Sequence, residues 1–201
     1  MRISCALATL LCAVMGCTSQ GSEAAERQRD TAGRRDSIAA VAAASMSEAQ
    51  VIGLLHFVHA ADSALGMLGA VSGSTRDIKD FGRMIVREHR ALSRDAVQLG
   101  ANLHLVPTEP SVTPDAPPDD MRGQLRRPPG AIWDQLYLDY AIAMHQSSME
   151  NSARALAATR SPATREFITK SVPILQKHLD KATSLRRALD TASNGASPPN
   201  P

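Results

Sequence analysis

Apolar residues recur at helical spacing in four stretches of the chain, and the last stretch shows the pattern most completely. Between residues 161 and 189 the apolar or small positions are separated by three or four residues, and His178 fills one place in the series; the members are Ile168, Ser171, Leu175, Ala182, Leu185 and Leu189. Such a stripe is typical of a helix that packs against other helices. Ser161 and Pro162 suit the N-cap and the first position of this helix.

Three more helices are predicted upstream of the last one. The four expected ranges are 48–72, 76–103, 131–159 and 163–190. Ser47 and Gln50 fit a capping box at the start of the first helix, and Gly73 suits its end. The connections after the first and third helices are only a few residues long, so each joins antiparallel neighbours. The pattern therefore predicts an all-α four-helix bundle domain over residues 47–190.

Residues 104–130 differ in composition and connect the second and third helices. Seven prolines exclude a regular helix or a central strand from this segment. An extended proline-rich chain rises about 3.1 Å per residue, which is enough to return along the roughly 40 Å length of a bundle helix. We therefore expect this segment to be the long Pro-rich crossover of an up-down-down-up bundle.

The N-terminus has the features of an export signal. Arg2 precedes an apolar run that is too short to span a membrane as a helix, and the run ends in Val14-Met15-Gly16-Cys17. This ending resembles the bacterial lipobox, which implies that residues 1–16 are a lipoprotein signal peptide and that Cys17 is lipidated. The alternative is an ordinary secretory signal that is cleaved elsewhere. Residues 17–46 are expected to be a tether, and residues 191–201 a disordered tail.

The lipobox resemblance also predicts a location. A lipidated Cys17 would attach the protein to a membrane of the cell envelope on its periplasmic side. Thr18 follows the cysteine where an aspartate would imply retention in the inner membrane, so the resemblance implies the outer membrane. The membrane is thus the expected partner, through the lipid anchor, and the sequence identifies no protein partner.

Composition narrows the remaining choices. The chain is 43% hydrophobic but only 3% aromatic, which favours helices over a β-sandwich. A formal net charge of +2 gives no reason to expect nucleic acid binding. All three cysteines lie within the first 17 residues, so the rest of the sequence contains neither a disulfide framework nor a thiolate metal site.

Four residues of types that commonly bind metals occupy positions within the apolar stripes, one near the middle of each predicted helix. Asp62, His89, His145 and His178 lie within about two residues of the helix midpoints, or roughly 3 Å along each axis. They are therefore expected at one level of the bundle, where three imidazoles and a carboxylate would suit zinc, copper or another transition metal. His59, one turn from Asp62, is an alternate ligand. The competing interpretation is a layer of hydrogen-bonded core residues with a purely structural role.

Catalysis is the least supported function. A di-iron carboxylate centre requires Glu-x-x-His pairs, which the sequence lacks, and Glu88 points roughly 100° away from His89 around the helix. The sequence also contains no recognisable nucleophile triad or phosphate loop. Two function classes stay open: a transition-metal-binding envelope protein, and a non-catalytic envelope or stress-related interaction module.

Three motifs carry a resemblance to a known family. Residues 81–89 (FGRMIVREH), residues 171–179 (SVPILQKHL) and the segment from Tyr137 to His145 resemble motifs of the "domain of unknown function 4142" family. The resemblance covers about residues 47–189. It implies a ferritin-like four-helix bundle, usually exported, with no established activity.

Overall fold

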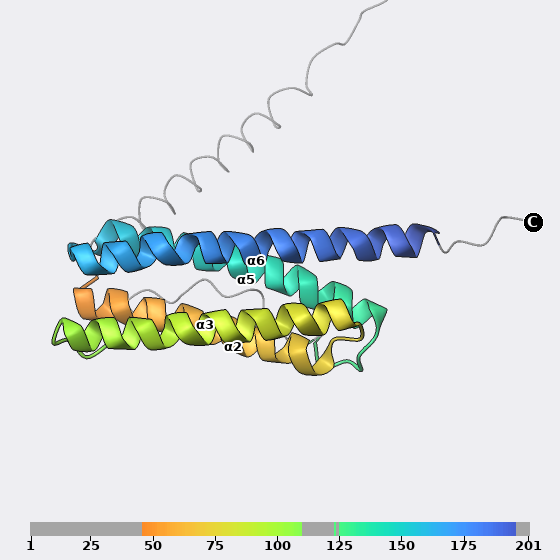
Figure 1. Cartoon of the computed structure of the whole chain (residues 1–201), viewed down its shortest axis with the longest axis horizontal. Coiled ribbons are helices and arrows are strands. Elements are labelled where there is room, and N and C mark those ends of the chain that lie inside the picture. The colour runs from red at the N-terminus through yellow and green to blue at the C-terminus, as the bar shows by residue number, and fades with distance from the viewer. Residues whose placement is uncertain (1–45, 110–122, 124, 196–201) are drawn as a thin grey trace, which may run out of the picture. The chain divides into compact units, whose positions relative to one another are not determined.

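The computed structural model describes residues 46–109, 123 and 125–195. This part of the chain contains no strand and forms four long helices (Figure 1), which are α2 (Glu48–Ser72), α3 (Arg76–Asn102), α5 (Ala131–Ala158) and α6 (Pro162–Gly195). The chain is thus an all-α four-helix bundle, as the apolar pattern predicts. The proposed signal peptide, Cys17, nearly all of the tether and the centre of the crossover lie outside the described residues.

Local sequence determines where the helices begin. The Ser47 hydroxyl accepts a hydrogen bond from the Gln50 backbone and the Gln50 side chain accepts one from the Ser47 backbone, which is the predicted capping box. Thr75 caps α3 through Ile78 N, and the Ser161 hydroxyl accepts from Thr164 N at the start of α6. These side chains satisfy amide groups that have no partner within the helix.

The end of α6 differs from the prediction. The apolar stripe ends at Leu189 and the tail was expected from residue 191, yet the helix continues to Gly195. The Thr191 hydroxyl donates to the Arg187 carbonyl one turn earlier. Because each added helical residue gains a backbone hydrogen bond, a helix can continue beyond the last residue that its apolar stripe buries.

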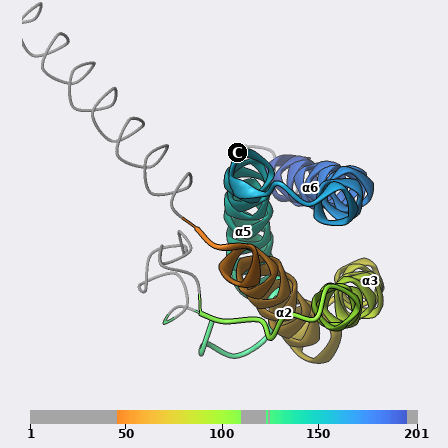
Figure 2. The same cartoon turned by 90° about the vertical axis from the view of Figure 1, so that its left-hand side faces the viewer.

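Two contacts between helix ends establish the topology. The Thr159 hydroxyl donates to Glu48 Oε1 over 2.7 Å, which brings the end of α5 to the start of α2. At the other end of the bundle, Ser74 N donates to Asp134 Oδ1 over 2.9 Å, so the α2–α3 turn lies against the start of α5. α5 is therefore antiparallel to α2 and parallel to α3, and the bundle is up-down-down-up. Figure 2 shows the α2–α3 pair beside the α5–α6 pair.

The described ends of the crossover lie at opposite ends of the bundle. Thr108 N donates to Ala49 O near the start of α2, and Leu125 O accepts from the Trp133 indole near the start of α5. The crossover passes so close to α2 that a Cβ on Gly53 would lie 1.8 Å from Thr108 O. A glycine at this position thus permits the approach.

α2 is the most apolar of the described helices. By length and composition it could cross a membrane, with a mean hydropathy of 1.5 over its most apolar window. In this structure 61% of that window is buried, and α2 packs against both α3 and α5. Burial in the bundle is sufficient to account for its composition, because the core helix of a folded domain meets the same criteria.

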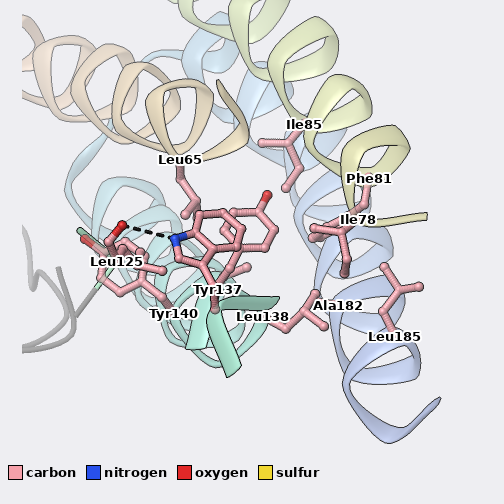
Figure 3. Packing of buried hydrophobic residues seen from close by; sticks show 12 residues of the cluster. Leu65, Ile78, Phe81, Ile85, Leu125, Tyr137, Leu138, Tyr140, Ala182 and Leu185 are labelled. Atoms are coloured by element: carbon pink, nitrogen blue, oxygen red, sulfur yellow. Dashed lines mark hydrogen bonds between the residues drawn. The ribbon is translucent and has the colours of Figure 1, made fainter. Parts of the chain in front are cut away.

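The apolar core consists of two clusters. The larger one, shown in Figure 3, includes Phe81 and Tyr137. It also contains Trp133, whose ring stacks on that of Tyr137 with the centroids 5.2 Å apart. The second cluster lies toward the start of α2 and includes Leu54, Leu55, Val58, Ala96, Ala155 and Ile168. On every helix, the residues between the two clusters include buried polar side chains. A polar layer therefore divides the core.

α2 and α3 approach each other closely because glycines face one another. A Cβ added to Gly82 would lie 2.3 Å from Ala70 N and 2.6 Å from Gly66 O. These neighbours are backbone atoms, which cannot rotate away as a side chain would. The two glycines thus set the spacing that brings the polar groups of α2 and α3 into contact.

We predict that Gly82→Ala destabilises the bundle. Helix propensity alone favours alanine by about 1 kcal/mol, but overpacking against fixed atoms costs about 1–3 kcal/mol, so the melting temperature measured by circular dichroism should fall. Gly123→Ala is the control, since a Cβ there meets no atom within 4 Å. A melting temperature that rises in the Gly82 variant would contradict the close approach.

Candidate metal centre

Five polar side chains that commonly bind metals meet in the layer between the two apolar clusters. α2 contributes His59 and Asp62, while the other three helices contribute one imidazole each: His89, His145 and His178. All five are fully buried, with an exposed fraction of 0%. The structure thus brings together the four residues of the predicted layer and the alternate residue His59. His56 and His104 lie elsewhere: His56 Nδ1 pairs with the Ser93 hydroxyl, and His104 is exposed.

The five side chains form two groups that share His89. One group contains His89, His145 and His178; the other contains His59, Asp62 and His89; within each group one ligating atom per residue lies within 4.8 Å of the others. His89 Nε2 is 3.0 Å from His178 Nδ1. His89 Nδ1 is 3.3 Å from His59 Nδ1 and 3.5 Å from Asp62 Oδ2. Asp62 therefore belongs to the group of His59 and His89 and not to the group of three histidines.

His145 has its tautomer determined by the backbone. Its Nδ1 donates to the Ala141 carbonyl, 2.7 Å away and one turn earlier on α5. In a neutral imidazole the other nitrogen is then an acceptor with a free lone pair. This Nε2 atom is buried and has no hydrogen-bond partner among the described residues. The ring centroid lies 5.4 Å from that of His89 and 5.3 Å from that of His178, so His145 lies beside both rings.

His178 is oriented by a carboxylate. Its Nε2 donates to Glu88 Oε2 over 3.0 Å, and the same carboxylate pairs with Lys177. The lone pair of neutral His178 is therefore on Nδ1, the atom beside His89 Nε2. Helical geometry alone does not predict a role for Glu88, because it points away from His89 on its own helix. Its hydrogen bond with His178 on α6 gives Glu88 a role in orienting that ring, which the geometry of α3 alone does not predict.

Asp62 is placed to orient the ring of His89, as Glu88 orients that of His178. Its Oδ2 accepts a hydrogen bond from the Ser148 hydroxyl over 2.8 Å and lies near His89 Nδ1. Each imidazole of the first group thus has its outer nitrogen close to an oxygen acceptor: Asp62, the Ala141 carbonyl or Glu88. Metal-binding histidines usually have such a partner, which sets the ring orientation and raises ligand basicity.

Burial keeps three of the imidazoles neutral, those of His59, His89 and His178. Desolvation is the main cause that lowers the pKa of His59 to about 3 and that of His178 to about 4, and neighbouring histidines lower both further. Burial likewise lowers the pKa of His89 far below its usual value. For Asp62, desolvation outweighs the opposing effect of His145 and of Ser148, and raises the pKa to about 6. Neutral imidazole is the form that binds a metal ion.

The donor set and spacing suit a borderline metal ion. A zinc–nitrogen bond of 2.0–2.1 Å implies a nitrogen–nitrogen separation of about 3.3 Å in a tetrahedral site. The 3.0 Å between His89 Nε2 and His178 Nδ1 is close to that value. Three imidazoles with partnered outer nitrogens fit zinc, copper or nickel. The arrangement does not resemble a di-iron site, since the single carboxylate at its centre comes from Asp62.

The comparisons with known proteins agree with the motifs. No curated protein and no solved structure matches the chain. The family model described as "Domain of unknown function (DUF4142)" matches residues 34–185, which include all four helices up to the last turns of α6 and every residue of the polar layer. The chain belongs to the DUF4142 family.

Proposed function

We propose that this protein is an exported, lipid-anchored envelope protein that binds one divalent transition metal ion through His89, His145 and His178. In this proposal Asp62, the Ala141 carbonyl and Glu88 act as outer partners that orient the three rings. The protein would hold the ion inside the bundle, as a binding or storage module of the envelope. No catalytic step is assigned to it.

The main observation in support of this proposal is that His145 Nε2 is buried and has no hydrogen-bond partner among the described residues. A buried acceptor without a partner costs about 1–3 kcal/mol, and an apolar side chain in its place would avoid that cost. The atom lies beside two further imidazoles whose lone pairs or protons face the same space. A bound cation gives His145 Nε2 the partner that the described residues do not supply.

The second candidate function is a non-catalytic interaction module with a structural histidine layer. A continuous hydrogen-bonded row supports it. Glu88 accepts from His178, and neutral His178 then accepts from His89 Nε2–H, so that His89 Nδ1 accepts from His59 Nδ1–H. This row connects three helices without an ion. His145 is not part of this row. The proposed metal site needs His145 as a ligand, whereas the structural row does not, so a substitution of His145 distinguishes the two functions.

The proposed location rests on the sequence around Cys17. The short apolar run and the lipobox-like ending support export, lipidation and attachment to the outer membrane on its periplasmic side. The periplasm is oxidising, so cysteine ligands there can be lost to disulfide formation, whereas imidazole ligands cannot. A metal-binding domain without cysteine ligands therefore suits this compartment.

We predict that zinc, copper or nickel raises the melting temperature of the chelator-treated protein. An ion that binds only the folded state stabilises it in proportion to the logarithm of the free ion concentration. His145→Leu should abolish this rise without lowering the melting temperature of the ion-free protein by more than a few degrees, because the substitution removes an unpartnered polar atom. Thermal unfolding followed by circular dichroism, with and without metal, measures both effects.

A matched histidine variant controls this experiment. His56→Ala removes a half-buried imidazole of the same helical face as His59, but outside the cluster, and should keep the metal-dependent rise. If the wild-type melting temperature is indifferent to all three metals, the interaction module becomes the better supported function.

We predict that acid destabilises the ion-free protein. Three histidines of the layer have lowered pKa values, so unfolding at about pH 5 lets the chain take up three protons there. Asp62 has a raised pKa, so it releases one proton on unfolding at the same pH. The net uptake of about two protons means that stability falls as the pH drops from about 6.5 toward 4.

A comparison of the melting temperatures at pH 7 and at pH 5 tests whether stability falls on acidification. The drop between the two should be smaller in His59→Leu, which lacks one of the three histidines. An equal or higher melting temperature at pH 5 in the wild type would show that the layer is not kept neutral by burial.

We predict that Cys17→Ser prevents anchoring. Without the thiol no lipid can be attached, so the variant should accumulate as an uncleaved precursor or leave the membrane fraction. Fractionation of a bacterial host and the mass of the mature N-terminus measure the change. Cys12→Ser, which alters a cysteine within the proposed signal peptide, should leave processing as in the wild type. Unaltered processing of the Cys17 variant would favour an ordinary secretory signal.

A further inference from the structure

We infer that the layer binds a second metal ion at His59, Asp62 and His89 Nδ1, so that His89 bridges two ions as an imidazolate. The inference rests on the proposed function, because the first ion occupies the side of His89 that carries Nε2. It changes the expected capacity from one ion per chain to two, and it assigns His59 and Asp62 as direct ligands.

The two nitrogens of His89 face two different groups of donors. Nε2 faces His178 Nδ1 at 3.0 Å, while Nδ1 faces His59 Nδ1 at 3.3 Å and Asp62 Oδ2 at 3.5 Å. The two nitrogens of an imidazole lie on the same ring but point in different directions. An ion bound to one of them therefore leaves the other available to a second ion.

The His59 side of the layer has an unpartnered carboxylate atom of its own. Asp62 Oδ1 is buried and has no hydrogen-bond partner within the part of the chain that the structure describes. This observation is independent of His145, which lies in the other group. A carboxylate with one oxygen unpartnered in a dry core is costly unless a cation neutralises it.

The proton positions add a second argument. Glu88 determines that neutral His178 has its lone pair on Nδ1, so His89 carries its proton on Nε2 in the ion-free protein. His89 Nδ1 is then an acceptor, whose hydrogen bond comes from His59 Nδ1–H, and Asp62 Oδ2 is a second acceptor 3.5 Å away with no proton between the two atoms. An ion between these two atoms turns the unfavourable contact into a pair of coordinate bonds.

The binding steps balance in protons and charge. When the first ion bonds to His89 Nε2, the ring proton moves to Nδ1, where it faces Asp62. When the second ion bonds to Nδ1, the N–H bond breaks and the proton passes to solvent water. His59 binds through Nδ1, so the proton that this atom donates to His89 in the ion-free protein moves to His59 Nε2.

Charge compensation also favours the bridge. Two divalent ions bring four positive charges, against which Asp62 supplies one negative charge, since the charge of Glu88 is already paired with Lys177. The imidazolate supplies a second, so the bridged form leaves two uncompensated charges where an unbridged pair of ions would leave three. Uncompensated charge in a buried site is expensive.

Copper(II) titration of the purified, chelator-treated full-length chain tests the inference. Native mass spectrometry should count two ions per chain. Electron paramagnetic resonance should show a nitrogen-coupled signal at one equivalent and lose most of that signal at two equivalents, because an imidazolate bridge couples the two unpaired electrons. The second equivalent should also release one proton more than the first in a weakly buffered titration.

Variants separate the second site from the first. Asp62→Asn and His59→Leu should each bind a single copper ion and keep the resonance signal at two equivalents, while His56→Ala should behave as the wild type. One ion per wild-type chain would overturn the second site and leave the proposed function intact. Two ions with a doubled, uncoupled signal would overturn the bridge, and no bound ion would overturn both proposals.

Discussion

The bundle depends on placing five ionisable groups in its core at one level. A buried imidazole or carboxylate is tolerated only if its polar atoms find partners, and here the partners come from other helices. Glu88 on α3 accepts a hydrogen bond from His178 on α6, and Asp62 on α2 accepts one from Ser148 on α5. A shift of any helix by one turn would leave several of these groups unpaired. The polar layer therefore determines the register of all four helices.

The apolar clusters on either side of the polar layer stabilise the fold and so offset the free-energy cost of burying its polar groups. The cluster around Phe81, Trp133 and Tyr137 contains most of the aromatic side chains of the core, and the cluster near the start of α2 is aliphatic. Buried aromatic and aliphatic surface contributes about 25 cal/mol per Å². By excluding water from both sides, the clusters also keep His59, His89 and His178 neutral, which is the form of imidazole that can bind a cation.

Proton positions connect the structural and functional interpretations of the layer. In the ion-free protein, one carboxylate outside the centre sets the tautomer of His178, and through it those of His89 and His59. In the proposed metal-bound form, the same carboxylate is the outer partner of a ligand. His145 stands apart, because the Ala141 carbonyl determines its tautomer and its lone pair has no partner among the described residues. A purely structural layer has no use for such an atom, whereas a metal centre does.

The sequence by itself determined the helices and the level at which the polar residues meet. Periodicity, capping residues and proline content are local properties, and helix midpoints are preserved by parallel and antiparallel packing alike. Only the tertiary structure decided which ring nitrogen faces which donor, because this depends on side-chain rotation and on the neighbouring helix. Glu88 illustrates the limit: it points away from His89 on its own helix, and only the packing of α6 brings it to His178. The division of the layer into two groups around His89 likewise follows from the rotation of each helix about its axis, which spacing along the chain does not encode.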